Sequence, residues 1–227
     1  MSYPKPRGYK IPKDVIESTS NINKKEAVFT KKKDPFSKLK QIGINREKNS
    51  VDYYSGNVKD RLYHTHVQSI DEYYFMCMPS VTDLISYYKQ RKKNNIPIQG
   101  IFIIDEKTGK NIGRTFFTFT NNTEKIIDTL YKRYKKFISK NEDDSLIKEL
   151  LFTSDSSAIK ILTSNVGSNV FQKKQILFQL FLNKKMNDNQ SERRRYDILT
   201  KDLGIKIRFV PMPGYKFNKE TFRFEKK

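Results

Sequence analysis

Two histidines, His64 and His66, have the spacing in this sequence that comes nearest to a metal site, and the chain contains no others. One residue separates them, so in a β-strand both imidazoles point to the same face of the sheet. A catalytic metal site needs a third ligand, for which Asp71, Glu72 and Cys77 are candidates. Their spacing matches no established metal motif, so we expect two polar strand residues and no bound metal.

A second candidate site is the acidic cluster Asp105–Lys107, which follows an apolar run and lies downstream of Asp83. Carboxylates and a lysine at a strand end could hold Mg²⁺ and orient a water, as metal-dependent nucleases require. With Thr108 and Gly109, however, the same residues form a common hairpin loop, because Asp and Gly suit tight turns. We therefore expect a turn here. The other acidic-x-Lys match, Glu225–Lys227, is a weaker candidate.

The sequence carries no other catalytic signature. It has no Gly-x-x-x-x-Gly-Lys-Ser/Thr or Gly-x-Ser-x-Gly motif, and Gly109–Gly113 fits a hairpin better than a phosphate-binding loop. Cys77 lies among Phe75, Met76 and Met78, a setting typical of a buried thiol. We expect no catalytic residues and no cofactor.

Basic residues give the clearer binding signal. The chain has 45 Lys+Arg against 25 Asp+Glu, a net charge of +20 that favours anionic partners. Enrichment in Lys, Asn, Ile, Tyr and Phe is also typical of AT-rich coding sequence, which accounts for part of this charge. The residues expected to contact phosphate or an acidic partner are Lys89, Arg91, Lys92, Lys93, Lys132, Arg133, Lys136, Arg193, Arg194 and Arg195.

Two of these basic clusters have structural explanations as well. Arginine forks suit phosphate, but Arg193–Arg195 open a predicted helix, where cations oppose the helix dipole. Asp188, Glu192, a partner's acidic surface or a nucleic-acid backbone should therefore compensate them, and a solvated face is the remaining alternative. Lys89–Lys93 end a predicted helix, where cations complement the dipole.

The elements that carry these residues fall into two parts. Residues 1–60 are rich in Pro and Lys without sustained apolar periodicity, and predict an extended basic arm. In this arm we expect assembly contacts from Lys31, Lys32, Lys33 and Phe36. Residues 61–227 predict a globular α+β domain.

Local patterns define the domain further. Ser80 and Asp83 form a capping box that starts a helix, and the runs on either side of Gly109 predict a β-hairpin. The remainder, from about residue 123, is mainly helical. The expected fold class is α+β: a small antiparallel sheet with a central β-hairpin flanked by helices, a helical C-terminal half and an extended N-terminal arm.

Cysteine content and hydropathy indicate the compartment. The single cysteine, Cys77, excludes an internal disulfide and fits a reducing compartment. No apolar run is long enough to span a membrane, and the first residues do not resemble a secretory signal. We expect a virion or intracellular location, with no secretion and no membrane contact.

Together these features lead to two hypotheses about function. The first is a structural component of a large assembly, with a virion protein of a phage capsid, neck or collar as the leading case and an organellar ribosomal protein as a variant. It would contact other copies of itself or other assembly proteins, with basic surfaces toward nucleic acid or acidic neighbours. The alternative is a free-standing, non-specific nucleic-acid-binding protein, with metal-dependent nuclease activity as a variant.

Overall fold

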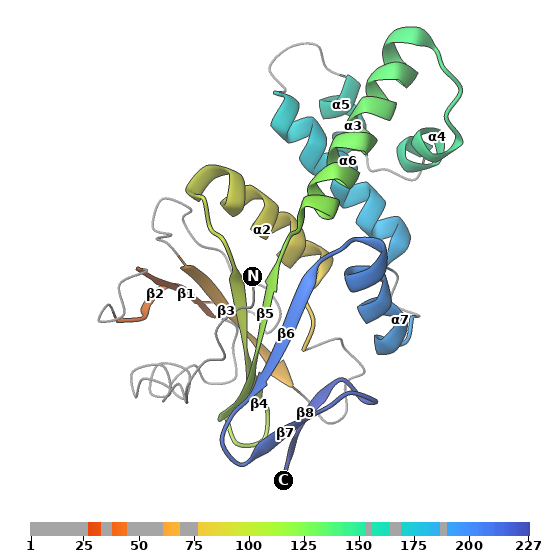
Figure 1. Cartoon of the computed structure of the whole chain (residues 1–227). Helices are drawn as coiled ribbons and strands as arrows, with labels where there is room; N and C mark the ends of the chain where they lie inside the picture. The colour runs from red at the N-terminus through yellow and green to blue at the C-terminus, as the bar shows by residue number, and fades with distance from the viewer. Residues whose placement is uncertain are drawn as a thin grey trace.

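A six-stranded mixed sheet forms the centre of the protein (Figure 1). The computed structural model describes residues 27–32, 38–44, 61–68, 77–152, 156–163, 169–186 and 190–227. In spatial order the sheet contains β2 (Lys40–Ile44), β1 (Ala27–Lys31), β3 (Arg61–Gln68), β4 (Gln99–Asp105), β5 (Asn111–Thr118) and β6 (Lys206–Pro211). A separate two-stranded sheet joins β7 (Tyr215–Asn218) and β8 (Arg223–Lys226).

Among the described residues, helices occur at two places along the chain. Helix α2 (Val81–Asn94) connects β3 to β4. The others lie between β5 and β6: α3 (Asn121–Lys140), α4 (Ser145–Phe152), α5 (Ser156–Thr163), α6 (Val170–Lys185), α7 (Glu192–Asp197) and the π-helical turn η2 (Ile198–Asp202). Within these described ranges, no helix is long and apolar enough to cross a membrane.

The expected α+β class is confirmed, and the pairing of strands adds one difference. Strands β4 and β5 form the predicted hairpin, with Gly109 at φ 65° in its loop. Strands β3 and β4, in contrast, run parallel, so the sheet is mixed. The reason is α2: a helix between two neighbouring strands carries the chain back across the sheet, and the second strand then runs in the same direction as the first.

One face of the sheet carries the main hydrophobic core. Strand β4 turns Ile101 and Ile103 toward this face, where Leu84 and Tyr88 of α2 and Phe178 of α6 pack in the same buried cluster. Fully burying an aliphatic or aromatic side chain of this size stabilises the fold by about 1.5–3 kcal/mol. The helix α2 is therefore held firmly against the sheet by its apolar residues.

Two segments of the predicted arm belong to this sheet instead. Strand β1 lies between β2 and β3, and its residues Ala27, Val28 and Phe29 are buried. Val28 pairs with His64 and Lys31 with Arg61. Each strand has only five residues. Such short runs give no recognisable periodicity, so only strand pairing reveals them: β1 pairs with β3, and β2 pairs with β1. Apart from residues 27–32 and 38–44, residues 1–60 lie outside the described residues.

Helices α3 to α6 form a separate helical lobe that projects beyond the end of the sheet (Figure 1). They enclose a second hydrophobic cluster of their own. Its buried members are Leu130, Tyr134, Ile147, Leu150, Leu162 and Leu177. We use the name helical lobe for residues 121–186 below.

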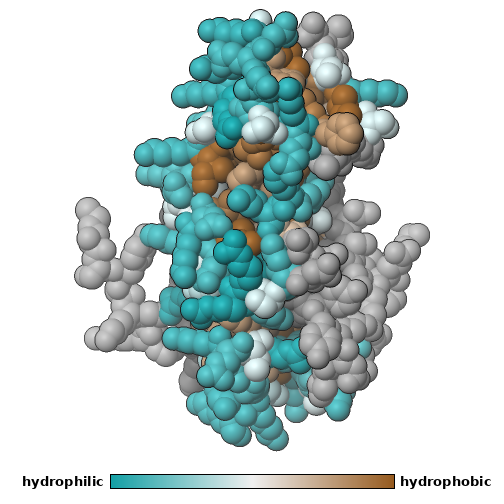
Figure 2. Space-filling view, turned by 90° about the vertical axis from the view of Figure 1, so that its right-hand side faces the viewer, coloured by the Kyte–Doolittle hydropathy of each residue, from teal (hydrophilic) through white to brown (hydrophobic). Residues whose placement is uncertain are grey.

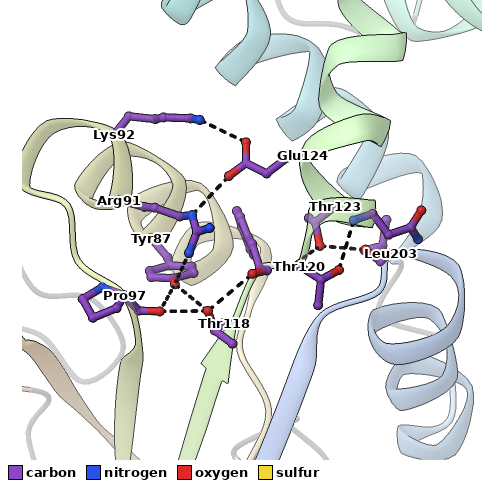
Figure 3. A network of polar contacts seen from close by, with 11 residues as sticks. Tyr87, Arg91, Lys92, Pro97, Thr118, Thr120, Thr123, Glu124 and Leu203 are labelled. Atoms are coloured by element: carbon purple, nitrogen blue, oxygen red, sulfur yellow. Dashed lines mark hydrogen bonds and ion pairs between the residues drawn. The ribbon is translucent and has the colours of Figure 1, made fainter. Parts of the chain in front are cut away.

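A polar network fixes the base of the helical lobe to the rest of the fold (Figure 3). At the start of α3, the Thr120 hydroxyl donates to the Gly204 carbonyl at 2.7 Å, and the Thr123 hydroxyl donates to the Leu203 carbonyl at 2.8 Å. Glu124 accepts from Arg91 and Lys92 of α2. The lobe is thus connected both to α2 and to the chain entering β6.

Candidate metal centre

Three side chains that can ligate a metal converge between β3 and α2. The Nε2 atom of His64 lies 3.0 Å from Oδ1 of Asp83, and the Nε2 atom of His66 lies 3.3 Å from Oδ2 of the same carboxylate. The two Nε2 atoms are 3.0 Å apart. Among the described residues, these three form the one group of His, Cys, Asp and Glu side chains that is close enough to share an ion.

The strand and the helix bring the group together for simple reasons. His64 and His66 are two positions apart in β3, so both face the side of the sheet on which α2 packs. Because α2 follows β3 in a parallel β–α–β unit, its first turn returns to the carboxyl end of β3. Ligands bind at this end of the strands in open α/β sheets.

The capping box places Asp83 within the first turn of α2. The Ser80 hydroxyl accepts from the Asp83 amide at 3.1 Å, while Oδ2 of Asp83 accepts from the Ser80 amide at 2.7 Å. Oδ2 also accepts from the Ser80 hydroxyl at 2.9 Å. These bonds hold the carboxylate in one orientation and leave Oδ1 directed at His64.

Burial and charge in the site favour an ionised carboxylate. Burial alone would raise the pKa of Asp83, but the electrostatic effect of His64 and His66 and hydrogen bonds from the rings outweigh it and hold the pKa well below its ordinary value. Asp83 is therefore an anion at neutral pH, as a metal ligand must be. The His64 side chain is 6% exposed, whereas those of His66 and Asp83 are 13% and 14% exposed. Solvent thus approaches from the His66 and Asp83 side.

The ligand atoms lie close enough together to share one ion, and hydrogen bonds between neutral rings account for only part of the arrangement. Two neutral imidazoles whose Nε2 atoms both donate to one carboxylate would bring two N–H groups head to head. If one ring is unprotonated at Nε2, it no longer donates to Asp83. In contrast, metal–ligand bonds of about 2.0–2.1 Å in tetrahedral geometry separate ligand atoms by about 3.3 Å. The distances from His64 Nε2 to His66 Nε2 and to Oδ1 of Asp83, 3.0 Å each, are slightly shorter than this value, and the 3.3 Å contact of His66 is with the other oxygen, Oδ2.

The other ligands that the sequence suggested do not join this group. Asp71 and Glu72 lie outside the described residues. Cys77 is buried as expected, its Sγ donates to Oε1 of Gln68 at 3.5 Å, and burial raises the pKa of its thiol far above the ordinary value. The third residue is Asp83, which the sequence placed in a helix cap and, upstream of the Asp105 cluster, in the weaker nuclease pattern, but not with the histidines. A His-x-His strand followed by a helix start was the available signal.

The Asp105 cluster is the predicted turn. Oδ2 of Asp105 accepts from the Thr108 amide at 3.0 Å and from the Thr108 hydroxyl, and the Gly109 amide donates to the Asp105 carbonyl at 2.8 Å. The carboxylate is thus engaged in the hairpin loop. Within the described residues it belongs to no group of potential metal ligands.

The three arginines at the start of α7 have different environments. Arg195 is buried, at 6% exposure, whereas Arg193 and Arg194 are exposed. Arg193 lies 3.8 Å from Asp197, an acidic residue of the same helix. Because successive helix positions are rotated by about 100°, one arginine of three consecutive ones faces the core. The three therefore do not form one phosphate-binding cluster.

The basic residues of α2 and α3 are partly neutralised. Glu124 lies 3.1 Å from both Arg91 and Lys92. Arg133 donates two hydrogen bonds, of 2.6 and 2.7 Å, to Asp144. Lys136 lies 3.6 Å from Glu142. Lys89, Lys93 and Lys132 are exposed, and no described acidic side chain pairs with them.

Of the arm residues, Lys31 ends β1 and Lys32 follows it. Lys33 and Phe36 lie outside the described residues.

Comparison of the chain with protein-family models, with curated proteins and with solved structures finds no match. The geometry of the site therefore carries the functional argument.

Proposed function

We propose that this protein is a metal-dependent hydrolase that binds one divalent ion, zinc being the first to test, through His64, His66 and Asp83. The observation that carries the proposal is the approach of both histidine Nε2 atoms to each other at 3.0 Å and to a single carboxylate. Two imidazoles and one carboxylate are the donor set of catalytic zinc sites in peptidases. Amide bonds of polypeptides are accordingly the first substrate class to test.

The number and placement of the ligands favour a catalytic site over a structural one. Structural zinc sites are closed by four protein ligands, whereas catalytic sites use three and leave a position open. Zinc in such a site lowers the pKa of a bound water and polarises a carbonyl oxygen. Here the ligands number three among the described residues, and the partial exposure of His66 and Asp83 leaves one side accessible.

The protein's own groups prepare the site for a cation. Asp83 supplies a fixed negative charge, and Ser80 orients it through its amide and hydroxyl. The negative charge also compensates the positive end of the α2 dipole, which would otherwise repel a cation. The strongly basic surface favours substrates that are themselves anionic, such as acidic polypeptides.

This proposal departs from the sequence-based expectation of a protein without catalytic residues or metal. That expectation considered Asp71, Glu72 and Cys77 as a third ligand for His64 and His66, and nothing in the sequence linked the two histidines to Asp83. The assembly role is retained below as a second candidate.

Cobalt substitution tests the proposal without knowledge of the substrate. The protein should bind one equivalent of Co²⁺ and show the visible absorption of a four- or five-coordinate site, and acetohydroxamate should shift that spectrum by occupying the open position. The Asp83→Asn variant should show neither effect. Absence of specific cobalt binding, or a spectrum unchanged by acetohydroxamate, would exclude an open catalytic site. Iron rather than zinc in the purified protein would indicate oxidative chemistry, since Fe²⁺ uses the same donor set.

A second candidate function, binding to assembly partners, is favoured by the surface of the helical lobe. Figure 2 shows hydrophobic side chains reaching the surface between hydrophilic ones in the upper part of the molecule, where the lobe lies. Of five large hydrophobic residues that the described residues expose, four belong to the lobe, namely Ile138, Phe152, Ile161 and Val170. Phe152 is 92% exposed.

Exposed apolar residues among lysines suit a protein partner with an acidic rim. Mass photometry at low and high salt, with and without duplex DNA, tests this second candidate. Defined oligomers without DNA that Phe152→Ser weakens would support it. A monomer under all conditions would contradict self-assembly, and a monomer that binds DNA only at low salt would favour the nucleic-acid alternative.

A further inference from the structure

A buried glutamine, Gln99, contacts His64 on the side of its ring that faces away from Asp83. Gln99 begins β4, pairs with Leu62 in the parallel register and is 3% exposed. Its Nε2 atom lies 3.1 Å from Nδ1 of His64, the ring nitrogen that faces away from Asp83. Its other polar atom, Oε1, has no hydrogen-bond partner among the described residues. No sequence pattern singles out this residue.

The contact with Gln99 fixes the tautomer of His64. As the side chains lie, the Gln99 amide donates to Nδ1, so the ring carries its proton on Nε2 and donates it to Asp83. This arrangement gives both ring nitrogens of His64 a partner without an ion. It also blocks metal binding, because Nε2 must present a lone pair to ligate a metal and the proton must then reside on Nδ1.

We propose that Gln99 is a positioning residue whose amide rotates by half a turn when the metal binds. The rotation exchanges Nε2 and Oε1, so that Oε1 accepts from Nδ1–H while Nε2 of His64 turns its lone pair to the ion. The amide oxygen and nitrogen are nearly equal in size, so the rotation needs little extra space. Because Oε1 has no described partner, the rotation breaks one hydrogen bond and remakes one.

The identity of the side chain is essential to this role. An amide is a donor at one end and an acceptor at the other, so glutamine serves both tautomers of His64. A carboxylate accepts only, and would hold a proton on Nδ1 of His64 at all times, as metal binding through Nε2 requires. An aliphatic side chain would stabilise neither tautomer of His64. The inference rests on the proposed metal centre, but the role of Gln99 in setting the His64 tautomer without metal can be tested separately.

Nitrogen-15 NMR of the histidine rings tests the role of Gln99 in setting this tautomer. In the wild-type protein without metal, His64 should carry its proton on Nε2, and zinc should move it to Nδ1. In Gln99→Glu the Nδ1–H tautomer should already be present without metal. If His64 is an Nδ1–H tautomer in the metal-free wild type, or if Gln99→Glu leaves the tautomer unchanged, the proposed role of Gln99 is wrong.

Zinc affinity, measured by competition with a chelator at neutral pH, tests the role of Gln99 in metal binding. Gln99→Leu should weaken binding by about ten- to a hundredfold, the effect typical of losing an outer-shell partner, and Gln99→Glu should bind at least as tightly as wild type. Gln90→Leu is the matched control, since Gln90 is also a buried glutamine, at 2% exposure, but lies in α2 outside the group.

The outcomes separate the two proposals. Wild-type protein that binds no zinc would overturn the metal centre, whatever the tautomer of His64. Equal affinities in wild type, Gln99→Leu and Gln99→Glu would overturn the role of Gln99 and leave the centre intact. Should Gln99→Glu fail to fold, Gln99→Leu together with the wild-type NMR spectra still decides the question.

Discussion

The carboxylate of Asp83 accepts hydrogen bonds from both the amide and the hydroxyl of Ser80, at 2.7 and 2.9 Å, while its other oxygen lies 3.0 Å from His64. One side chain thus serves two purposes. It stabilises the start of α2 and it completes a group of metal-ligating atoms. Because the two roles use different chemistry, substitutions can separate them.

Asp83→Asn should separate these roles. The asparagine carbonyl can still accept from the Ser80 amide and keep the capping box, so we expect the free energy of unfolding to fall by no more than about 1 kcal/mol. Zinc affinity should fall by more than about 100-fold, beyond the loss of an outer-shell partner. Calorimetric titration and denaturant unfolding measure the two effects. Asp105→Asn, at the hairpin loop, is the control and should leave zinc affinity unchanged.

Zinc should stabilise the folded protein. A ligand that binds only the native state at 100 times its dissociation constant adds about 2.7 kcal/mol. Thermal unfolding with zinc and with a chelator measures this difference. In the double variant His64→Ala, His66→Ala the difference should vanish. An equal rise in the double variant would assign the stabilisation to zinc bound elsewhere.

Stability should decrease between pH 4.5 and about 7 because of Glu192. Burial raises the pKa of this carboxyl from its ordinary value of 4.5 to about 7, against the lowering effects of Arg223 and Arg195. The folded state therefore binds the proton more tightly than the unfolded state. The resulting stabilisation is complete below pH 4.5 and is lost as the pH rises through about 7.

The expected size of this loss is on the order of 1–2 kcal/mol, since the side chain is partly exposed and solvent screens it. Denaturant unfolding across this pH range measures it, and the curve for Glu192→Gln should be flatter. An equally steep curve in Glu192→Gln would assign the pH dependence to another group.

Asp144 should be the most important acidic residue of the helical lobe. It forms two bonds with Arg133 and accepts from the Ile147 amide at 3.1 Å at the start of α4. The hydrogen bonds from Arg133 hold the pKa of this carboxyl below its ordinary value, so the stabilisation is present above that value and is lost as pH falls through the lowered one.

Asp144→Ala should destabilise the protein by about 1–2 kcal/mol, since it removes a helix cap and a bidentate pair. Asp143→Ala should cost less than about 0.5 kcal/mol, because Asp143 forms one exposed ion pair with Lys148. Denaturant unfolding of the two variants compares them. Equal losses would mean that the geometry of the Arg133 pair adds nothing.

The arginines of α7 should behave differently from one another. Arg195→Ala should destabilise the protein by about 2–4 kcal/mol because it empties a buried position beside Glu192, whereas Arg193→Ala and Arg194→Ala should each change stability by less than about 0.5 kcal/mol. Thermal unfolding measures all three. If Arg195→Ala is neutral, the buried position does not contribute to the core.

The local patterns of the sequence were sufficient for the elements that depend on neighbouring residues. The capping box at Ser80 and the hairpin loop at Gly109 are confirmed, because both are formed by residues close in the chain. Strands β1 and β2 were missed, since β1 takes its place in the sheet by pairing with β3, further along the chain, and β2 joins the sheet through β1.

The candidate metal centre shows the same limit. The sequence indicated that His64 and His66 share a face, and it placed Asp83 at a helix start. It did not reveal that α2 returns to β3 and brings the three residues together, because that requires the parallel pairing of β3 and β4. Gln99 escaped notice for the same reason, since only the register of β4 places it behind His64.

The most direct test of the metal centre is the zinc stoichiometry of the purified full-length protein, measured by mass spectrometry of the native protein and by calorimetric titration. The wild type should bind one zinc ion per chain, and His64→Ala, His66→Ala and Asp83→Asn should each lose that ion while Asp105→Asn keeps it. Wild-type protein that binds no zinc or other divalent metal, or zinc binding that survives all three substitutions, would contradict the account.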